Sequence, residues 1–539
     1  MQSNKGTKDM KRRDFLRATS AAAAIGLMPK LAMPARAQTS NTLKFIPQAD
    51  LAVIDPIGTT AYVTRNHAMM IFDTLYGVDN SFTAKPQMVE GHTIENDGKL
   101  WKMVLRPGLK FHDGEPVLAR DVVASLKRWM SKDVFSQALV AVLEEISAPD
   151  DRTVQLRLSK PFPLLPDLLG KIGSYSTAIM PERLASTDAK TALTELVGSG
   201  PYRYVASERV PGSLNVYEKF ADYIPRQELA EYLSGGKVAH FDRVEWHTIP
   251  DAATAAAALQ AGEMDWWEQP TADLLPLFAA GNDVKTEIKD KSGNTGLLRM
   301  NCLQPPFDNP AIRRIVLQSI RQADFMLAVV GEDQSMWHTP VGFFHPDSVM
   351  ASTEGLDTFT KEIDYEKVKG ELKAAGYNGE RVVIMSTADY PSIKAMCEVT
   401  ADLFRKIGFN VDYQVLDWAT VASRMKNQEG LDKGGWSVVC NFTAALSTYN
   451  PSAHTWLRSA GVKSFDGWPS IPRIEELRDE WFEASETAAQ ASIGAEIQKV
   501  ALDQVPYVPL GLFYVPTAYR SNITDILDGI PLFWNVRRV

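Results

Sequence analysis

The stretch Leu105–Val117, LRPGLKFHDGEPV, followed by Ala119–Ser125, ARDVVAS, decides the fold of this chain. Its Pro-Gly pair predicts a turn after a strand ending at Arg106, and its Asp-Gly pair predicts a second turn after a short strand. The residues that follow place apolar side chains on one helical face: Val122, Val123, Leu126 and Trp129. We therefore predict a strand-turn-strand-turn-helix unit.

This order of residues resembles the signature of the family-five extracellular solute-binding proteins, which are the dipeptide, oligopeptide and nickel receptors of ABC importers. Three other segments resemble motifs of the same family: Phe72–Gly77 (its xDTLY segment), Val197–Tyr202 (its GTGPY turn, with Ser for Thr) and Gly262–Asp265 (its GEVD corner). The resemblance runs from Asn41 to the end of the chain. It implies an α/β, two-lobed periplasmic binding protein fold of the class II type, in the large three-subdomain form with a hinged cleft.

The resemblance also suggests a domain organisation. We expect a signal peptide (1–37), a lobe I main domain (38–70, 195–297 and 506–539), a subdomain inserted in lobe I (71–194) and lobe II (298–505). The two crossings between the lobes would form the hinge.

The first residues predict export. Lys11–Arg17, KRRDFLR, is a twin-arginine motif, and the apolar run Ala18–Met28 is too short to anchor the chain in a bilayer. Ala35–Ala37 supplies the small residues that signal peptidase reads, so we expect cleavage after Ala37. The mature protein is therefore expected in the periplasm.

Length and charge narrow the class of protein. The chain has 539 residues and is 45% hydrophobic, so two or three domains are expected. Residues 1–37 hold eight Lys/Arg and two Asp/Glu, so the full totals of 57 and 66 fall to 49 and 64 and the mature net charge is −15. This excess of acid argues against nucleic acid as a partner. We expect a monomer.

Motifs for catalysis, metals and cofactors are missing from the sequence. The histidine spacings fit neither HExxH nor a zinc finger, and there is no G-x-S-x-G, G-x-G-x-x-G or G-x-x-x-x-G-K-[ST]. We expect no enzyme activity, no cofactor and no metal, and any ATP-driven step must belong to another polypeptide. Of Cys302, Cys397 and Cys440, two could form a disulfide; Cys397 is expected to pack as a small apolar residue.

A βαβ unit is predicted in the second lobe. Arg381–Met385 reads as an apolar strand, Ser392 as the cap of a helix that ends at Gly408, and Val411–Val415 as the next strand. Such strands are normally parallel, and ligands bind beyond their carboxyl ends. Ser386–Tyr390 should therefore lie at the cleft.

One feature of the family is missing. In peptide-binding relatives a Gly-Trp pair is followed within three residues by an Asp that pairs with the peptide α-ammonium group; here Val439 stands three residues after Trp436, and residues 436–451 contain no acid. An unpaired buried ammonium is disfavoured by several kcal/mol. Either the ligand lacks a free ammonium group, which we favour, or Asp50 or Asp389 supplies the charge.

The candidate ligand-binding residues are aromatic or polar: Gln48, Asp50, Asp389, Trp418, Trp436, Asn441 and Thr443. Aromatic faces and amides suit a neutral, hydroxyl-rich or amide-containing solute. Replacing Trp436 by Ala is expected to abolish binding without unfolding the protein. Of Trp266 and Trp267, one could face the cleft and the other the core.

The sequence thus favours a periplasmic receptor that captures a small solute, peptide-like or neutral and polar, by lobe closure and delivers it to an ABC permease with its ATPase subunits. Two alternatives remain: a secreted hydrolase, and a module that presents ligand to a chemoreceptor.

Overall fold

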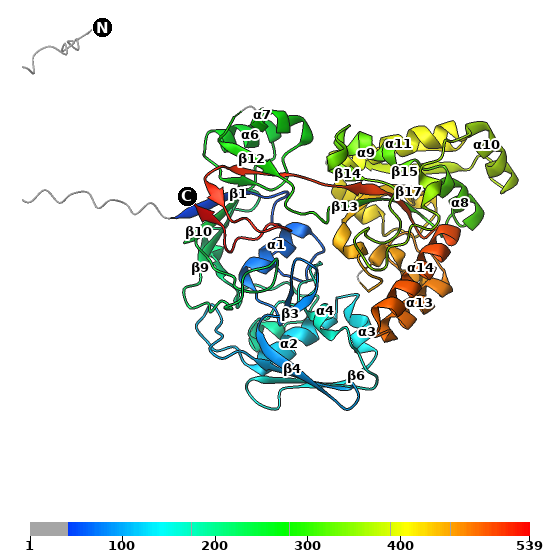
Figure 1. Cartoon of the computed structure of the whole chain (residues 1–539). Coiled ribbons are helices and arrows are strands. Elements are labelled where there is room, and N and C mark those ends of the chain that lie inside the picture. The colour runs from blue at the N-terminus through cyan, green and yellow to red at the C-terminus, as the bar shows by residue number, and fades with distance from the viewer. Residues whose placement is uncertain (1–40, 174, 280, 389, 453) are drawn as a thin grey trace, which may run out of the picture. The chain divides into compact units, whose positions relative to one another are not determined.

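The computed structural model describes residues 41–539 except 174, 280, 389 and 453. The expected signal peptide and Asp389 lie outside the described residues. Three larger sheets, of seven, six and four strands, organise the described chain (Figure 1).

The seven-stranded sheet contains the first described strand. In spatial order its strands are β12 (Val284–Glu287), β19 (Thr517–Arg520), β11 (Trp266–Trp267), β1 (Thr42–Ile46), β10 (Arg243–His247), β9 (Leu214–Lys219) and β8 (Tyr202–Tyr204). β1 is parallel to β10 and β11, and the other pairs are antiparallel. The carboxyl ends of β1 and β11 therefore lie side by side.

The four-stranded sheet is antiparallel. Its order is β4 (Val89–Glu95), β5 (Leu100–Leu105), β7 (Thr153–Leu158) and β6 (Leu143–Ser147). In the signature stretch, the expected second short strand is reduced to a single bridge between Lys110 and Pro116. The helix that follows, α2 (Ala119–Met130), is confirmed and buries the predicted apolar face.

The family motifs pack against one another. The neutral imidazole of His112 accepts a hydrogen bond from Gly198 N (3.2 Å) at Nδ1, so Nε2 donates to Gly200 O (3.0 Å). Burial lowers the pKa of His112 to about 4, which fits this tautomer. Ser199 in turn accepts from Asp73 N (3.1 Å). The expected structural role of the GSGPY turn is thus supported.

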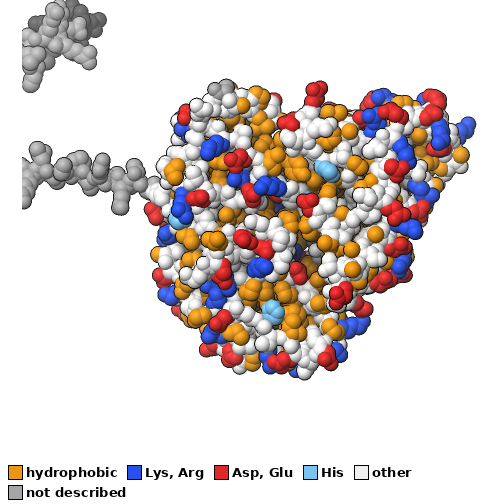
Figure 2. Space-filling model, viewed as in Figure 1, with side chains coloured by type: hydrophobic (Ala, Val, Ile, Leu, Met, Phe, Trp, Pro, Cys, Tyr) orange, Lys and Arg blue, Asp and Glu red, His pale blue; other side chains and the backbone are white. Residues whose placement is uncertain are grey.

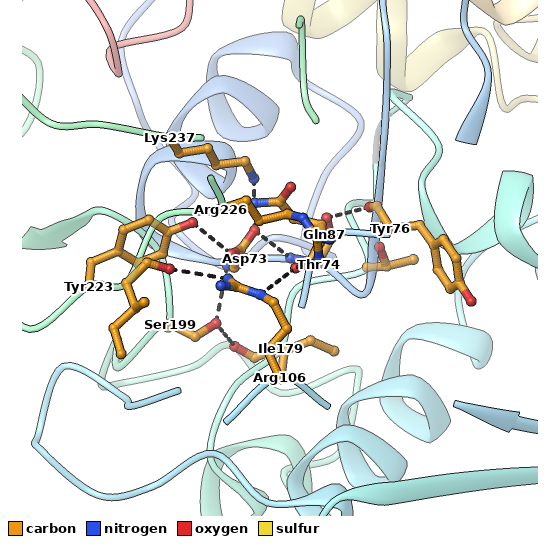
Figure 3. Close-up of polar contacts among 12 residues, drawn as sticks. Asp73, Thr74, Tyr76, Gln87, Arg106, Ile179, Ser199, Tyr223, Arg226 and Lys237 are labelled. Carbon is orange, nitrogen blue, oxygen red and sulfur yellow. Dashed lines mark hydrogen bonds and ion pairs between the residues drawn. The ribbon is translucent and has the colours of Figure 1, made fainter. Parts of the chain in front are cut away.

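Asp73 is the centre of a buried polar cluster (Figure 3). Its carboxylate accepts from Lys237 Nζ (2.7 Å) and from the Tyr223 hydroxyl (2.8 Å). Both Asp73 and Lys237 have at most 1% of their side chains exposed. The two charges can be buried because they form an ion pair with each other. The ion pair fixes the position of the chain just after α1 (Tyr62–Ile71).

The six-stranded sheet lies in the second half of the chain. Its order is β14 (Trp337–His338), β18 (Val508–Phe513), β13 (Asn294–Met300), β17 (Val438–Ala444), β15 (Arg381–Thr387) and β16 (Asn410–Leu416). β15 and β16 are parallel and joined by α11 (Pro391–Lys406), which confirms the predicted βαβ unit. The predicted cap is wrong: Pro391 occupies the first turn and Tyr390 precedes it, so Ser392 lies inside the helix.

The remaining helices and strands connect or cover these sheets. They are α3 (Ser136–Val140), α4 (Leu165–Leu169), α5 (Glu182–Ala185), α6 (Ala252–Gln260), α7 (Leu275–Ala279), α8 (Pro310–Gln318), α9 (Gln322–Val330), α10 (Tyr365–Ala374), α12 (Trp418–Arg424), α13 (Pro472–Glu483), α14 (Thr487–Gln504), and the strand pairs β2 (Tyr76–Val78) with β3 (Ala84–Pro86) and β20 (Ile523–Thr524) with β21 (Arg537–Arg538).

We call residues 41–287 and 517–539 lobe I and residues 294–513 lobe II, because their strands belong to different sheets. The chain crosses between the lobes at 288–293 and 514–516, and the second crossing appears in red in Figure 1. The expected boundary near residue 506 is therefore wrong, since β18 is a central strand of the lobe II sheet. The first crossing likewise ends at 293 rather than 297.

The three cysteines are unpaired, and Cys397 is fully buried in the lobe II core, as expected for a small apolar residue. Among the described residues, no helix is both long and apolar enough to cross a membrane. On the face shown in Figure 2, acidic and basic side chains are interspersed rather than gathered by sign.

Candidate functional site

A polar cavity lies where the two crossings meet the lobes. Its lining comes from lobe I (Gln48, Tyr62, Arg65, Trp266, Glu268, Gln269 and the segment 527–531), from the crossings (Lys289, Asp290, Gly293, Val515) and from lobe II (Asn294, Ala444), with Thr517 at the start of β19. Its volume is about 60 Å³, which is room for a few water molecules. A larger solute requires the lobes to move apart.

The sheet topology explains why Gln48 and Glu268 meet in this cavity. Phe45 and Ile46 of β1 pair with Trp266 and Trp267 of β11, so the residues just after both strands emerge at the same edge. Gln48 N donates to Glu268 Oε2 (2.8 Å), and Gln48 Nε2 donates to Oε1 (3.0 Å). The site thus lies beyond the carboxyl ends of parallel strands, as is usual for ligand sites in such sheets.

Helix α1 supplies a buried cation. Arg65 is only 6% exposed, and its guanidinium lies over the Tyr62 ring, 4.6 Å from the ring centroid. Arg65 Nε and Nη2 both donate to Asn66 Oδ1, at 3.2 and 3.0 Å. Asn66 Nδ2 donates onward to Glu268 Oε1 (3.1 Å), so the amide of Asn66 separates the cation from the carboxylate.

Glu268 titrates near neutrality. Burial raises its pKa to about 7, against the opposing effects of its hydrogen bonds from Gln48 and Asn66 and of the charge on Arg65. A carboxyl group in this state changes charge within the physiological range of pH.

The other charged groups at the cavity already have partners. Lys289 Nζ lies 2.8 Å from Glu287 Oε2 and 3.9 Å from Asp528 Oδ1. The Asp290 carboxylate accepts from both the backbone N and the hydroxyl of Ser292. These groups therefore add polarity to the cavity wall while remaining neutralised or hydrogen-bonded.

The lobes touch beside the cavity. Ala444 N, at the end of β17, donates to the Tyr62 hydroxyl (2.7 Å). Nearby, the rings of Phe82 and Tyr449 lie 5.1 Å apart, and Leu446 packs against a lobe I cluster that includes Met69. The structure thus has its lobes in contact.

The structure brings only one of the described candidate residues, Gln48, into this cavity. Asp50 is half-buried, 3.5 Å from Thr248 Oγ1, and Trp418 is half-buried with its ring 5.4 Å from that of Tyr390. Asn441 Oδ1 accepts from Phe442 N, and Thr443 Oγ1 bonds Ser447 Oγ. Asp389 lies outside the described residues.

Trp436 is placed differently from our expectation. Its indole is fully buried in the lobe II core, where Nε1 donates to Met425 O (3.1 Å) and Trp468 lies 6.0 Å away. Trp436 precedes β17, whereas the cavity lies at the other end of that strand, at Ala444. We therefore assign Trp436 to the core.

The register of β17 in the lobe II sheet also corrects our expectation about Val439, the position three residues after Trp436 where peptide-binding relatives have an Asp. Val439 is fully buried at the middle of the sheet, paired with Arg299 and Met385, so no side chain at this position could face the cavity. The relevant positions are Ala444 and the residues just after it. Residues 436–451 contain no acid, so this segment brings no carboxylate to the cavity.

Sequence reasoning missed Arg65, Glu268 and Lys289. A signal existed for Glu268, because it directly follows the Trp266-Trp267 pair. Those two rings do diverge: Trp266 lines the cavity and donates to Thr517 Oγ1 (2.6 Å), while Trp267 packs near Phe278 in a separate core cluster. Arg65 carried no signal, because nothing in the sequence shows which side of α1 faces the cavity.

Comparison with known proteins agrees with this architecture. Residues 83–456 match bacterial extracellular solute-binding proteins, family 5 Middle. A probable peptide ABC transporter periplasmic-binding protein of Sinorhizobium fredii is 34% identical over 531 residues, covering 98% of this chain and 99% of the relative.

Two solved structures share the fold. The PBP AgaA from A. tumefacien R10, in complex with agropinic acid, matches with a TM-score of 0.78 and 20% identity, covering 92% of this chain and 99% of that one. A dipeptide binding protein from Pseudoalteromonas sp. SM9913, in complex with Met-Leu, matches with a TM-score of 0.77 and 20% identity, covering 92% and 100%. The protein described here belongs to family 5 of the bacterial extracellular solute-binding proteins.

Proposed function

We propose that this protein is the periplasmic receptor of an ABC importer, which captures a small solute between its lobes and delivers it to a membrane permease and its ATPase subunits. The polar cavity at the two crossings carries this proposal, because both lobes contribute to its wall. Contacts to both lobes favour the closed form when solute is bound. The relative from Sinorhizobium fredii, described as a peptide ABC transporter binding protein, supports the same class.

The cavity suits binding rather than catalysis. Its described lining includes no Ser, His or Cys, the side chains that most often act as nucleophile and base in acyl transfer. We propose that the solute is released unchanged. This favours the receptor over the secreted hydrolase.

We further propose that the chain is exported by its twin-arginine signal, cleaved after Ala37, and acts as a monomer without a nucleic-acid partner. The mature net charge of −15 supports the last point, since it repels phosphate backbones.

Screening purified residues 38–539 against libraries of peptides, sugars and organic acids tests the function. A solute that binds raises the melting temperature with its concentration, and mass spectrometry should recover it intact. Deleting the gene should abolish uptake of that solute. Conversion of the solute would instead indicate a hydrolase, and loss of chemotaxis with normal uptake would indicate the chemoreceptor module.

A further inference from the structure

Among the cavity residues that the structure describes, Arg65 is the cation with no carboxylate at ion-pair distance. Within the part of the chain that the structure describes, no carboxylate oxygen lies within 4.0 Å of the Arg65 guanidinium, although 94% of the residue is buried. Arg243, a half-buried arginine of the same chain, has acids at 2.6 and 2.7 Å. Burying an unpaired charge costs several kcal/mol, so a partner from outside the protein would be stabilising.

The guanidinium is already oriented. Nε and Nη2 are committed to Asn66 Oδ1, the Tyr62 ring lies against the guanidinium face, and Nη1 is the nitrogen with no hydrogen-bond partner among the described residues. A guanidinium fixed in this way loses little side-chain entropy when it binds an anion. The arrangement matches what a binding site needs before its ligand arrives.

No acid at the cavity can serve as the missing partner without giving up other contacts. Glu268 already accepts three hydrogen bonds, from Gln48 N, Gln48 Nε2 and Asn66 Nδ2. Asp290 is occupied by Ser292, and Lys289 is paired with Glu287. Arg65 therefore offers the cavity a buried and oriented donor, Nη1, that no carboxylate of the described cavity wall approaches within 4.0 Å.

We propose that the solute carries a carboxylate and that Arg65 binds it through Nη1. This inference rests on the proposed receptor function and specifies its ligand class. Residues 436–451 of lobe II contain no acid, so this segment does not neutralise an ammonium group at the other end of the solute. The preferred ligands are organic acids and amine-blocked peptides.

Matched pairs of solutes test this proposal on purified residues 38–539. One member of each pair has a free carboxylate and the other has the corresponding amide. The pairs are agropinic acid with its amide, and N-acetyl-Ala-Ala with N-acetyl-Ala-Ala amide. The free dipeptide Ala-Ala and the phosphonate analogue of N-acetyl-Ala-Ala complete the panel. Calorimetry and melting temperature are measured for the wild type, R65Q, R65K and the control R243Q, which removes a half-buried arginine of lobe I that pairs with Glu208 and Glu245 and lies outside the cavity lining.

We expect at least one acid to bind the wild type while its amide binds at least tenfold more weakly. R65Q should lose at least tenfold in affinity for the acid, R65K should lose less, and R243Q should stay within about threefold of the wild type. The ordering of R65K between wild type and R65Q separates a charge effect from misfolding, and circular dichroism checks that each variant folds. If the phosphonate bound the wild type and none of the carboxylates did, the carboxylate assignment would be overturned.

Acid and amide binding the wild type equally, or R65Q binding the acid as tightly as the wild type, would overturn the role of Arg65 while leaving the receptor function intact. If no member of the panel bound the wild type but the library screen found a solute without a carboxylate, the carboxylate assignment would fail and the receptor function would stand. If no solute of the panel or of the library bound, the result would count against the receptor function itself.

Discussion

At the scale of single residues, burial decides what each charged or aromatic side chain does. Glu268 and Trp436 are both buried, but Glu268 faces a polar cavity and Trp436 an apolar core. Their substitutions should therefore have different consequences.

Glu268 should make the stability of the protein depend on pH. Because its pKa is raised to about 7 in the folded state, its contribution is fully present below about pH 4.5 and is lost as the pH rises through 7. The shift corresponds to about 3 kcal/mol. The free energy of unfolding in urea is measured for the wild type and E268Q at pH 5 and pH 8. Between these two pH values it should fall by about this much more for the wild type than for the variant. Equal losses would contradict the raised pKa.

Trp436→Ala should destabilise lobe II rather than act on the ligand alone. Removing a fully buried indole from a close-packed core costs about 3–5 kcal/mol. Denaturant unfolding should show a lower midpoint, and Trp418→Ala, at a half-buried position, should lower it clearly less. A folded Trp436→Ala variant of wild-type stability that no longer binds solute would return this residue to the site.

At the scale of elements, close backbone contacts between short motifs hold lobe I together. The GSGPY turn packs between the signature stretch and the end of α1. His112 forms hydrogen bonds with Gly198 and Gly200. A Cβ on Gly198 would lie 1.7 Å from Ile71 O. The glycine is required here by space.

Gly198→Ala should therefore prevent normal folding, since backbone has to move to admit a methyl group. Soluble yield and melting temperature after expression check this. Gly91→Ala is the control, because a Cβ there meets nothing within 4 Å, and its melting temperature should stay within a few degrees of the wild type. A stable, soluble Gly198→Ala variant would contradict this packing.

At the scale of the whole molecule, the contacts between the lobes set how often the unliganded protein is closed. Besides the bond from Ala444 N to Tyr62, Phe482 of lobe II lies near Phe135 and Phe162 of lobe I, with ring centroids 5.8 and 6.2 Å away.

Tyr62→Phe should shift the unliganded protein toward an open form. It keeps the ring over Arg65 and removes one hydrogen bond between the lobes, worth about 1 kcal/mol or roughly a fivefold change in the open-to-closed ratio. Small-angle scattering should show a larger radius of gyration. Tyr449→Phe is the control: the Tyr449 hydroxyl donates to Asp347 O within lobe II, so its loss should leave the scattering curve unchanged. An unchanged curve for Tyr62→Phe would show that the hydrogen bond to Ala444 does not hold the lobes together.

Export should depend on the twin-arginine pair. Replacing Arg12 and Arg13 by Lys keeps the charge but alters the motif, so full-length protein is expected to accumulate in the cytoplasm. Fractionation and immunoblotting check this, and N-terminal sequencing of the wild type should begin at Gln38. Undiminished export of the double variant would rule out the twin-arginine route.

The family motifs made the fold predictable, and local patterns made several elements predictable with it. Asp251 and Asn309 cap their helices, and such caps can be read from the sequence because they depend only on residues within one turn. The hinge positions were harder: β18 alone reads as an apolar strand, and only its pairing with β13 and β14 assigns it to lobe II.

The sequence alone determined the family, the kinds of elements and the lack of an acid in residues 436–451, because these depend on residue identity and local order. Only the tertiary structure decided the site. It buried Trp436, placed Val439 inside a sheet, and brought together Gln48, Arg65 and Glu268 from segments up to 220 residues apart. Which faces of a helix or strand meet a cavity depends on how distant elements pack, and no local pattern contains that information.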